Sequence, residues 1–227
     1  MSANSFIQTQ GDGRRYAMMD KSDIIMTKES NAAVLAVCHA RGWCASPDYM
    51  TKREAERVTD MSGNPFRANQ DLTSFDEFRF FTGISALPSN LFYNCKNLRY
   101  LTLPESVKTL GGGSLRFEPS STATHRVIFP ESVSIPYGHA VYNLSYGDRV
   151  DRIFIFTSPT PPTLGQETSF APGDGSKVKI YVPDDAISDY QAMANLREAY
   201  LDNFHPLSQC PPEHLRYNDL IGGSLQV

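Results

Sequence analysis

Residues that could perform chemistry are scattered along this chain of 227 residues, and they form no catalytic or metal-binding pattern. An enzyme needs a nucleophile with a base, a convergent set of acids, or ligands at metal spacing. The five histidines stand far apart and no motif frames them, at His39, His125, His139, His205 and His214. We therefore predict that the protein is not an enzyme, with no catalytic residues, no metal site and no cofactor.

The four cysteines fit neither a zinc site nor a redox pair. They lie 6, 51 and 115 residues apart, at Cys38, Cys44, Cys95 and Cys210. These spacings contain none of the paired, closely spaced cysteines that such sites use. We expect reduced thiols that are mostly buried, because free cysteine is among the most buried residue types.

A helix-loop-helix of EF-hand length is predicted near the N-terminus, with one helix over 30–41 and a second from Thr51. Thr51 and Glu54 have the spacing of a capping box, which marks the start of the second helix. Calcium needs oxygen ligands at loop positions 1, 3 and 5 and a bidentate acid at position 12. The run before Glu54 offers only Ser46 and Asp48, so we predict no calcium binding.

An internal repeat supplies the elements that would position any site. The sequence TLPESV returns as IFPESV 26 residues later. In the same register Leu103 aligns with Phe129, then Phe156, then Val182, at steps of 26, 27 and 26 residues. We therefore predict one shared core with equivalent residues buried in register: Leu101, Leu103, Val127, Phe129, Ile180 and Val182.

An earlier unit extends the repeat upstream, because Ile84 pairs with Val107 and Phe80 with Leu103 at a step of 23 residues. All these steps fall within the roughly 20–29 residues typical of leucine-rich repeats. The predicted fold class is α+β: a short leucine-rich-repeat solenoid of about five strand-turn units, with an N-terminal helical cap and a C-terminal capping helix.

The pattern of turns and periodic segments divides the chain into five parts. We predict an N-terminal assembly arm over 1–27, a helix-loop-helix cap over 28–71, leucine-rich repeats over 72–183, a C-terminal cap helix over 184–209 and a tail over 210–227.

One face of the repeat strands is expected to be a binding surface. Side chains alternate across a strand, so the neighbours of core residues face outward. The outward positions combine charged, apolar and aromatic residues: Tyr100, Thr102, Arg126, Ile128, Ile153, Ile155, Lys179 and Tyr181. A contiguous exposed apolar patch usually marks a partner site. The alternative is a register shifted by one residue in the run 153–156, which would swap its two faces.

Charge and hydropathy exclude two classes of partner. The net charge is -4 and no cluster of Lys and Arg is present, so nucleic acid is not expected as a partner. No apolar stretch approaches the roughly 18 residues that a membrane span requires. The N-terminal residues have no apolar core of a signal peptide, so export by the standard route is not expected.

The run LTSFDEFRFFTGISALPSNLFYNCKNLRYLTLPESVKTL, over 72–110, resembles the BspA-type leucine-rich repeats of Bacteroidetes and of their phages. KIYVPDDAISDYQAM resembles the closing repeat and cap of the same group. YMTKREAERVTD is similar to the degenerate EF-hand-like or dockerin-like helix pair that often precedes such repeats. The resemblance implies a non-enzymatic, surface-displayed recognition or adhesion module, and it implies no catalytic residues.

The predicted function is recognition and assembly. The first hypothesis is a structural component of a phage particle or similar assembly, such as a tail, fibre or decoration protein, that binds protein or glycan through its repeat surface. The first alternative is a bacterial cell-surface adhesin, and the second is a non-catalytic fragment of a carbohydrate-active protein. Expected partners are other subunits, a second copy of the chain included, and a host-surface protein or glycan. Expected locations are the virion for a phage protein, and otherwise the cell surface by a nonstandard route or the cytoplasm.

Contacts with other subunits are expected to order the two ends of the chain. Neither 1–27 nor 210–227 has enough periodic apolar content to fold by itself, and ordering a backbone costs about 1–2 kcal/mol per residue. The apolar residues available for such contacts are Phe6, Ile7, Ile24, Ile25, Leu220, Ile221, Leu225 and Val227.

Overall fold

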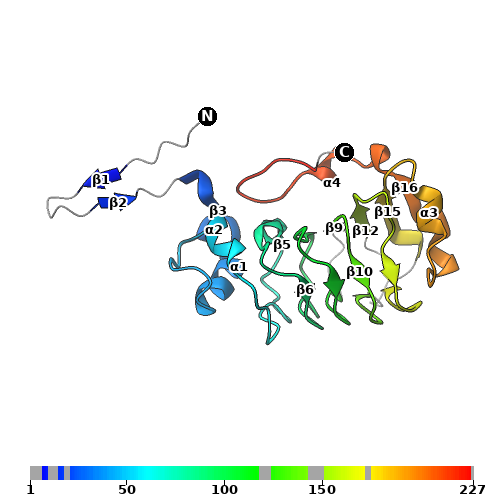
Figure 1. Ribbon diagram of the computed structural model, residues 1–227, viewed down its shortest axis with the longest axis horizontal. Helices are drawn as coiled ribbons and strands as arrows, with labels where there is room; N and C mark the ends of the chain where they lie inside the picture. Colours follow the sequence, from blue (N-terminus) through cyan, green and yellow to red (C-terminus); the bar gives the residue numbers. More distant parts are fainter. Residues whose placement is uncertain are drawn as a thin grey trace.

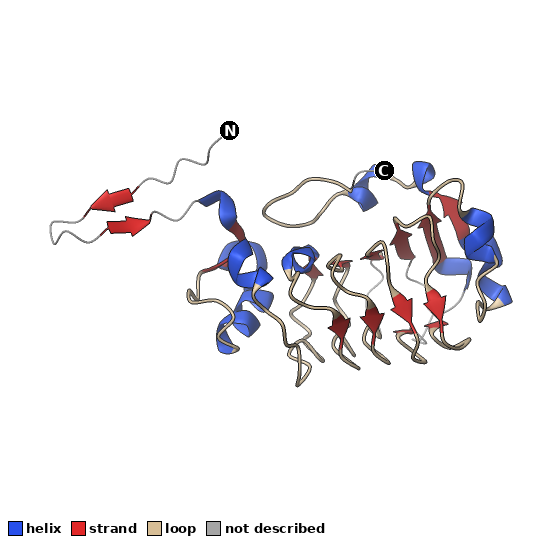
Figure 2. Cartoon of the chain, in the orientation of Figure 1, coloured by secondary structure: helices blue, strands red, loops and turns tan. Residues whose placement is uncertain are grey.

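The computed structural model describes residues 7–9, 15–17, 21–117, 124–142, 151–171 and 175–225. The main body is a row of stacked chain segments with helices at both ends (Figure 1). Strands line this row, and the C-terminal segment runs back along one side of it (Figure 2).

Two parallel sheets extend along the row. One has six strands in the order β16-β15-β12-β9-β7-β5, and the other has four in the order β13-β10-β8-β6. The strands of the six-stranded sheet are β5 (Ser74–Phe75), β7 (Tyr100–Thr102), β9 (His125–Phe129), β12 (Arg152–Phe156), β15 (Val178–Val182) and β16 (Phe204–Pro206). Those of the four-stranded sheet are β6 (Ala86–Leu87), β8 (Thr109–Leu110), β10 (Ser134–Ile135) and β13 (Thr163–Leu164). The chain therefore alternates between the two sheets as it advances from β5 to β13.

Three two-stranded pairs and several short helices complete the structure. β11 (Val141–Tyr142) pairs in parallel with β14 (Phe170–Ala171), while the antiparallel pairs join β1 (Ile7–Thr9) to β2 (Arg15–Ala17) and β3 (Ile24–Thr27) to β4 (Tyr49–Thr51). The α-helices are α1 (Lys28–Ala40), α2 (Lys52–Glu56), α3 (Ile187–Gln191) and α4 (Pro212–Leu215). The 3-10 helices are η1 (Lys21–Asp23), η2 (Asp76–Phe80), η3 (Gly175–Lys177), η4 (Glu198–Asn203) and η5 (Leu207–Gln209).

The fold class predicted from the sequence, an α+β leucine-rich-repeat solenoid of about five strand-turn units, is wrong. The chain is mixed α/β with large parallel sheets of six and four strands. The repeated spacing identified equivalent residues in successive segments, and parallel pairing follows from that equivalence. Spacing alone did not reveal that each segment contributes a second strand, because strands of two residues leave almost no alternation to read.

The strand register predicted from the repeat is confirmed. Leu101 pairs with Val127, and Phe129 pairs with Phe156. The upstream step of 23 residues is also found, where Leu87 pairs with Leu110. All six predicted core residues are buried in one continuous apolar cluster, and they are Leu101, Leu103, Val127, Phe129, Ile180 and Val182.

The first predicted strand is different. The predicted alignment of Phe80 with Leu103 is wrong, because Phe80 lies in the 3-10 helix η2 and the strand β5 ends before it at Phe75. In the sheet Phe75 pairs with Leu101, at a step of 26 residues. Phe75 and Phe78 still face the core, with ring centroids 4.9 Å apart. Phe80 itself is half-buried against this core, so the apolar pattern located the core at this end but neither the buried residues nor the backbone conformation.

The N-terminal helices close one end of the row. Thr51 and Glu54 form the predicted capping box, since the Thr51 hydroxyl accepts from the Glu54 amide at 3.3 Å and Glu54 Oε2 accepts from the Thr51 amide at 2.8 Å. Helix α1 departs from helical geometry at Asn31. The Asn31 side chain accepts from the Val34 amide, so it caps the rest of the helix.

The C-terminal cap differs from the single helix predicted over 184–209. Helix α3 ends at Gln191, and Asn195 has a left-handed backbone with φ of 64°. The chain then adds β16 to the six-stranded sheet, where Ile180 pairs with Phe204. Pro206 ends this strand at the edge of the sheet, where its missing N–H removes no ladder bond. A sixth strand, not a helix, covers the last sheet position.

No helix within the described residues is both long and apolar enough to cross a membrane.

Candidate functional site

The predicted binding residues lie on the strands and on the face expected of them. Ile128 pairs with Ile155, and Ile155 pairs with Tyr181, so these three side chains form a row across β9, β12 and β15. Phe154 and Phe156 belong to the main core, whereas Ile153 and Ile155 belong to a second, separate cluster. The alternative register, in which the two faces of this run are exchanged, is therefore excluded.

The expected exposure of this face is wrong. Ile128 and Ile153 are each 2% exposed, and Ile155 is fully buried. Thr102, Arg126 and Tyr181 are also buried, Tyr100 is half-buried, and Lys179 is the exposed member of the predicted set. The physical reason is that the chain's own C-terminal segment covers the face. Leu207 and Cys210 are buried in the second cluster, and Leu215, Tyr217 and Leu225 pack against it.

The covering segment ends in a short hairpin over 215–225, here called the C-terminal hairpin. Leu225 N donates to Leu215 O at 2.7 Å, and Tyr217 N donates to Gly223 O at 3.1 Å. The turn uses two glycines with positive φ, 67° at Gly222 and 93° at Gly223, a conformation that side chains disfavour. The sequence NDLIGG thus encodes a reversal of the chain, which the apolar periodicity did not reveal.

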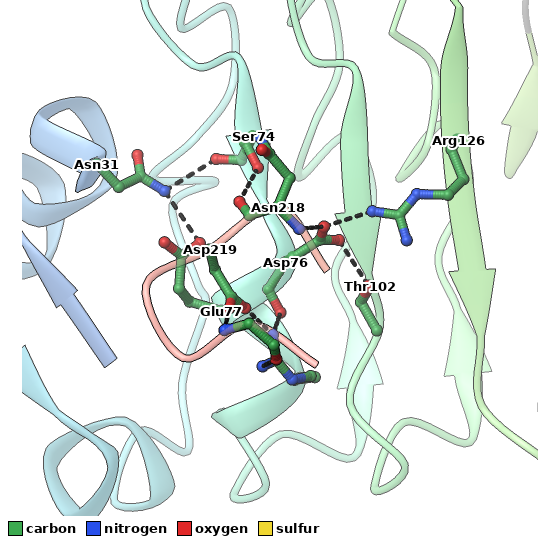
Figure 3. A network of polar contacts seen from close by, with 10 residues as sticks. Asn31, Ser74, Asp76, Glu77, Thr102, Arg126, Asn218 and Asp219 are labelled. Atoms are coloured by element: carbon green, nitrogen blue, oxygen red, sulfur yellow. Dashed lines mark hydrogen bonds and ion pairs between the residues drawn. The ribbon is translucent and has the colours of Figure 1, made fainter. Parts of the chain in front are cut away.

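A buried aspartate fastens this hairpin to the sheet (Figure 3). Asp76 Oδ2 accepts from the Asn218 amide at 2.7 Å and also pairs with the Arg126 guanidinium, while Asp76 Oδ1 accepts from the Thr102 hydroxyl at 2.6 Å. The side chains of Asp76 and Arg126 are both fully buried. Several donors to one carboxylate offset the cost of removing its charge from water.

Two further contacts hold the turn of the hairpin. Arg79 forms an ion pair with Asp219, and the Ser74 hydroxyl donates to Asn218 O at 3.0 Å. The Arg79 guanidinium also lies 4.2 Å from the ring centroid of Phe80 and 4.0 Å from that of Tyr217. Cation–ring contacts at this distance are favourable, more so when partly desolvated. The hairpin is therefore fixed through both its backbone and its side chains.

The network extends to the N-terminal helix through a buried glutamate. Asn31 Nδ2 donates to Ser74 O at 3.0 Å and to Glu77 Oε2 at 3.1 Å. Burial raises the pKa of Glu77 from 4.5 to about 7. A carboxylic acid kept from water favours its neutral form, so this group gains a proton near neutral pH in the folded protein.

The four cysteines are buried, and the EF-hand-length loop is hydrogen-bonded to the helix that follows it. All four cysteines are free and buried, and burial raises the pKa of Cys44 and Cys210 to about 11 and of Cys95 to about 12. In the loop, Glu54 Oε1 accepts from the Ala45 amide at 3.0 Å. No group of three or more His, Cys, Asp or Glu that could hold a metal ion occurs among the residues that the structure describes.

The predicted assembly contacts fall into three groups: side chains that pack on their own chain, side chains that are exposed, and residues whose side chains the structure does not describe. Ile25 is buried in the chain's own core, Ile24 is half-buried beside it in β3, and Leu225 packs on the second cluster. Leu220 and Ile221, at the turn of the C-terminal hairpin, are 51% and 44% exposed. Ile7 lies in β1, and Phe6 and Val227 lie outside the described residues. The prediction that other subunits must order the C-terminal tail is wrong for 210–225, because the chain's own sheet orders it.

Sequence reasoning identified Arg126 but missed its partner Asp76. The available signal was a pair of acids, Asp76 and Glu77, inside an otherwise aromatic run, since acids in such a run need a buried partner.

A search against family models, curated proteins and solved structures finds no match to this chain.

Proposed function

We propose that this chain is a non-catalytic recognition and assembly protein that contacts another protein subunit through the turn of its C-terminal hairpin. One observation carries the proposal: Leu220 and Ile221 are adjacent, large, aliphatic and exposed, on a turn whose neighbours are fixed by buried polar contacts. A turn whose backbone is already held by its neighbours loses less conformational entropy on binding than a free tail does. A rigid apolar turn is thus well suited to insert into a partner.

The polar contacts of the hairpin support this role. Asp219 pairs with Arg79, and its second oxygen accepts from the Gly222 amide at 2.8 Å. The turn is therefore braced on both sides of Leu220 and Ile221. An apolar pair in place of Arg79 and Asp219 could cover the sheet equally well. The ion pair differs from such a pair in that it fixes the position of the turn.

Oligomeric state tests the proposal, with a second copy of the chain as the first partner. We expect the wild-type protein to self-associate with increasing concentration in analytical ultracentrifugation, and the Leu220→Ser/Ile221→Ser variant to stay monomeric. Tyr137→Ser is the matched control, because Tyr137 is 57% exposed and lies in a turn outside the hairpin. A wild-type protein that is monomeric throughout, or a Tyr137 variant that loses association equally, would contradict the proposal.

The adhesin alternative has one observation in its favour. Residues 210–225 are held by their own chain, so no neighbouring subunit is required to order them. If the protein acts as a single chain, the wild type should remain monomeric in the same experiment. The Leu220→Ser/Ile221→Ser variant should then still bind the ligand of the protein. The setting in a phage particle stays a prediction, as does the resemblance from which it came.

A further inference from the structure

The repeat is interrupted at one place on the four-stranded sheet, in the connection that leads to its last strand. Ile128 pairs with Ile155, and Ser134 pairs with Thr163. The first residues of these two pairs are six residues apart in sequence, whereas their partners are eight residues apart. The longer connection, over 157–162, contains three prolines, Pro159, Pro161 and Pro162. It therefore cannot repeat the path of the shorter connection beside it.

The preceding connections are joined to each other by polar contacts. Glu105 Oε2 accepts from the Glu131 amide at 3.0 Å. Lys108 Nζ donates to the Ser132 hydroxyl at 2.5 Å. These contacts close the gap between two successive layers of the stack on this side of the molecule.

The next gap is not closed in this way. Within the described residues, no hydrogen bond joins 130–133 to 157–162. The Thr160 amide donates instead to Ser158 Oγ in its own connection, at 3.0 Å, and the prolines have no amide hydrogen to donate. The Glu131 carboxylate is left without a hydrogen-bonding partner in the described part of the chain.

A cavity of about 280 Å³ lies at this gap. A second cavity, of about 250 Å³, adjoins it, because Pro161 and Thr163 line both. The second cavity extends to Asp189 of α3 and to Met193. Together the two cavities form a groove along the stack with Thr163 at its middle, which we call the Thr163 groove. The polar lining of the first cavity consists of Lys108, Glu131, Ser132, Ser134, Thr160 and Thr163.

A row of hydroxyl side chains continues the groove along the outward face of the sheet. Ser134 lies between Thr109 and Thr163 in the strand pairing. The residue that follows each of them is buried in the core, so the three hydroxyl side chains point outward. Neighbouring strands lie about 4.8 Å apart, which makes the row straight and evenly spaced. Thr109 and Ser134 are half-buried, and Thr163 is exposed.

We propose that the Thr163 groove binds a neutral, extended oligosaccharide of the β-1,4-linked glucan type, with a sugar ring on each side of Thr163. A sugar hydroxyl both donates and accepts, so it can donate to the carboxylates of Glu131 and Asp189 and accept from the Lys108 ammonium group. Each cavity has a volume near the lower limit of ligand pockets, which suits a single ring. One sugar unit of such a chain is about as long as the spacing between strands, so the hydroxyl row meets successive units. The inference is independent of the function proposed above, because the C-terminal hairpin lies on the other sheet.

Two other classes of linear ligand fit less well. A peptide strand would have to extend the sheet at β13, but the Leu164 carbonyl there already accepts from Asn195 Nδ2 at 2.9 Å. A polyanion would meet the carboxylates of Glu131 and Asp189. The Lys108 ammonium group opposes them with a single charge, and two of its three donors are already used within the chain. A neutral ligand avoids both conflicts.

Calorimetric titration of the full chain with cellohexaose tests the proposal, because cellohexaose is a neutral, extended β-1,4-linked glucan. We expect Glu131→Ala to weaken binding about tenfold or more, since it removes hydrogen bonds to a charged group. Thr163→Val keeps the shape of the side chain and should weaken binding about two- to tenfold, as for one neutral hydrogen bond. Maltohexaose contains the same sugars in a curved, α-1,4-linked chain and should show no binding at the same concentrations.

Glu167→Ala and Thr73→Val are the matched controls, because both residues are exposed and neither lines the groove. Both variants should bind cellohexaose as the wild type does. Glu131 and Thr163 are also exposed, so all four variants should keep the wild-type melting temperature. Absence of binding at millimolar cellohexaose, equal binding of maltohexaose, or an equal loss in either control variant would overturn the proposal. Tighter binding of a glucosamine hexamer would show that the groove selects cations, which contradicts a neutral ligand.

Discussion

Most side chains on both faces of the six-stranded sheet are buried, but the two faces are covered by different means. The inner face is buried in the main apolar cluster, where Phe129 and Phe156 lie side by side with ring centroids 4.3 Å apart. The same cluster contains residues of the four-stranded sheet, namely Leu87, Leu110, Ile135 and Leu164. The outer face is covered by a segment from the far end of the sequence, and polar contacts at Asp76 and Arg79 hold that segment in place. Alternation along a strand therefore assigns a side chain to a face, but it does not determine whether that face meets solvent.

The largest expected effect is at the outer face, where Asp76→Ala removes one partner of a buried ion pair. The Arg126 guanidinium would remain buried without its counter-charge, so the free energy of unfolding should fall by about 3–5 kcal/mol. Urea denaturation measures this change. The Asp76→Ala/Arg126→Met double variant should recover much of the loss, because no unpaired charge stays buried. A double variant that is less stable than the single one would show that the pair is not the cause.

The inner face should respond almost as strongly to Leu103→Ala. Leu103 is 2% exposed, and a cavity at such a site costs about 2–5 kcal/mol in the free energy of unfolding. Denaturation by urea again provides the measurement, with Leu220→Ala on the exposed turn as the control. A loss near zero would mean that neighbouring layers do not pack against Leu103 as described.

The free energy of unfolding should depend on pH through Glu77 in the polar network, whereas the apolar inner face should contribute no such dependence. Since burial raises the folded-state pKa of Glu77 from 4.5 to about 7, the folded state binds more protons than the unfolded state between these values. Protonated Glu77 therefore adds to the free energy of unfolding below about pH 4.5. This contribution is lost as the pH rises through 7, and the free energy of unfolding falls by about 3 kcal/mol.

The Glu77→Gln variant isolates this contribution. Its stability relative to wild type should increase from pH 4.5 to about 7 and then become constant. The comparison between the two proteins is needed because burial lowers the pKa of His125 to about 4, and that group shifts stability in the opposite direction in both. Parallel stability profiles for the two proteins would contradict the role of Glu77.

A smaller effect is expected for Arg79→Lys, which keeps the charge but loses the planar group between Phe80 and Tyr217. Stacked arginine is not replaced well by lysine, and the loss should be about 1–2 kcal/mol. Hydrogen exchange should show it mainly at the amides of the C-terminal hairpin. Equal loss of protection in β9 and β12 would mean that the hairpin and the sheet open together.

The smallest effect is expected for an ion pair on neither face. Lys52 and Glu56 are paired at 3.9 Å on α2, with side chains 50% and 43% exposed. Glu56→Gln should change the free energy of unfolding by less than about 1 kcal/mol. Comparison with Asp76→Ala under the same conditions would sharpen the contrast between exposed and buried pairs, and a similar loss in both variants would remove it.

The sequence predicts the core of this molecule better than its architecture or its site. Equivalent core positions could be aligned from the sequence because each repeat needs an apolar side chain at the same place in its layer. These positions are Leu103, Phe129, Phe156 and Val182. The second strands could not be predicted, since two residues such as Thr109 and Leu110 are too short for a periodic signal. The capping box at Thr51 was readable because it depends only on residues three apart.

The candidate site depends on contacts that no local pattern encodes. Asp76 and Asn218 are separated by 142 residues, and neither lies in a motif. Arg126 was recognised as facing outward, but its burial depends on the C-terminal hairpin.

The distance in sequence between Asp76 and the hairpin that satisfies it has a consequence for biogenesis. At translation rates of roughly 5–20 residues per second, Asp76 is synthesised about 7–28 s before its Asn218 donor, which follows 142 residues later. During this interval the nascent sheet exposes Ile128, Ile153 and Ile155 without their cover. A chain terminated before Leu207 would lack every residue that covers this face, and its exposed apolar surface would be open to chaperones and proteases.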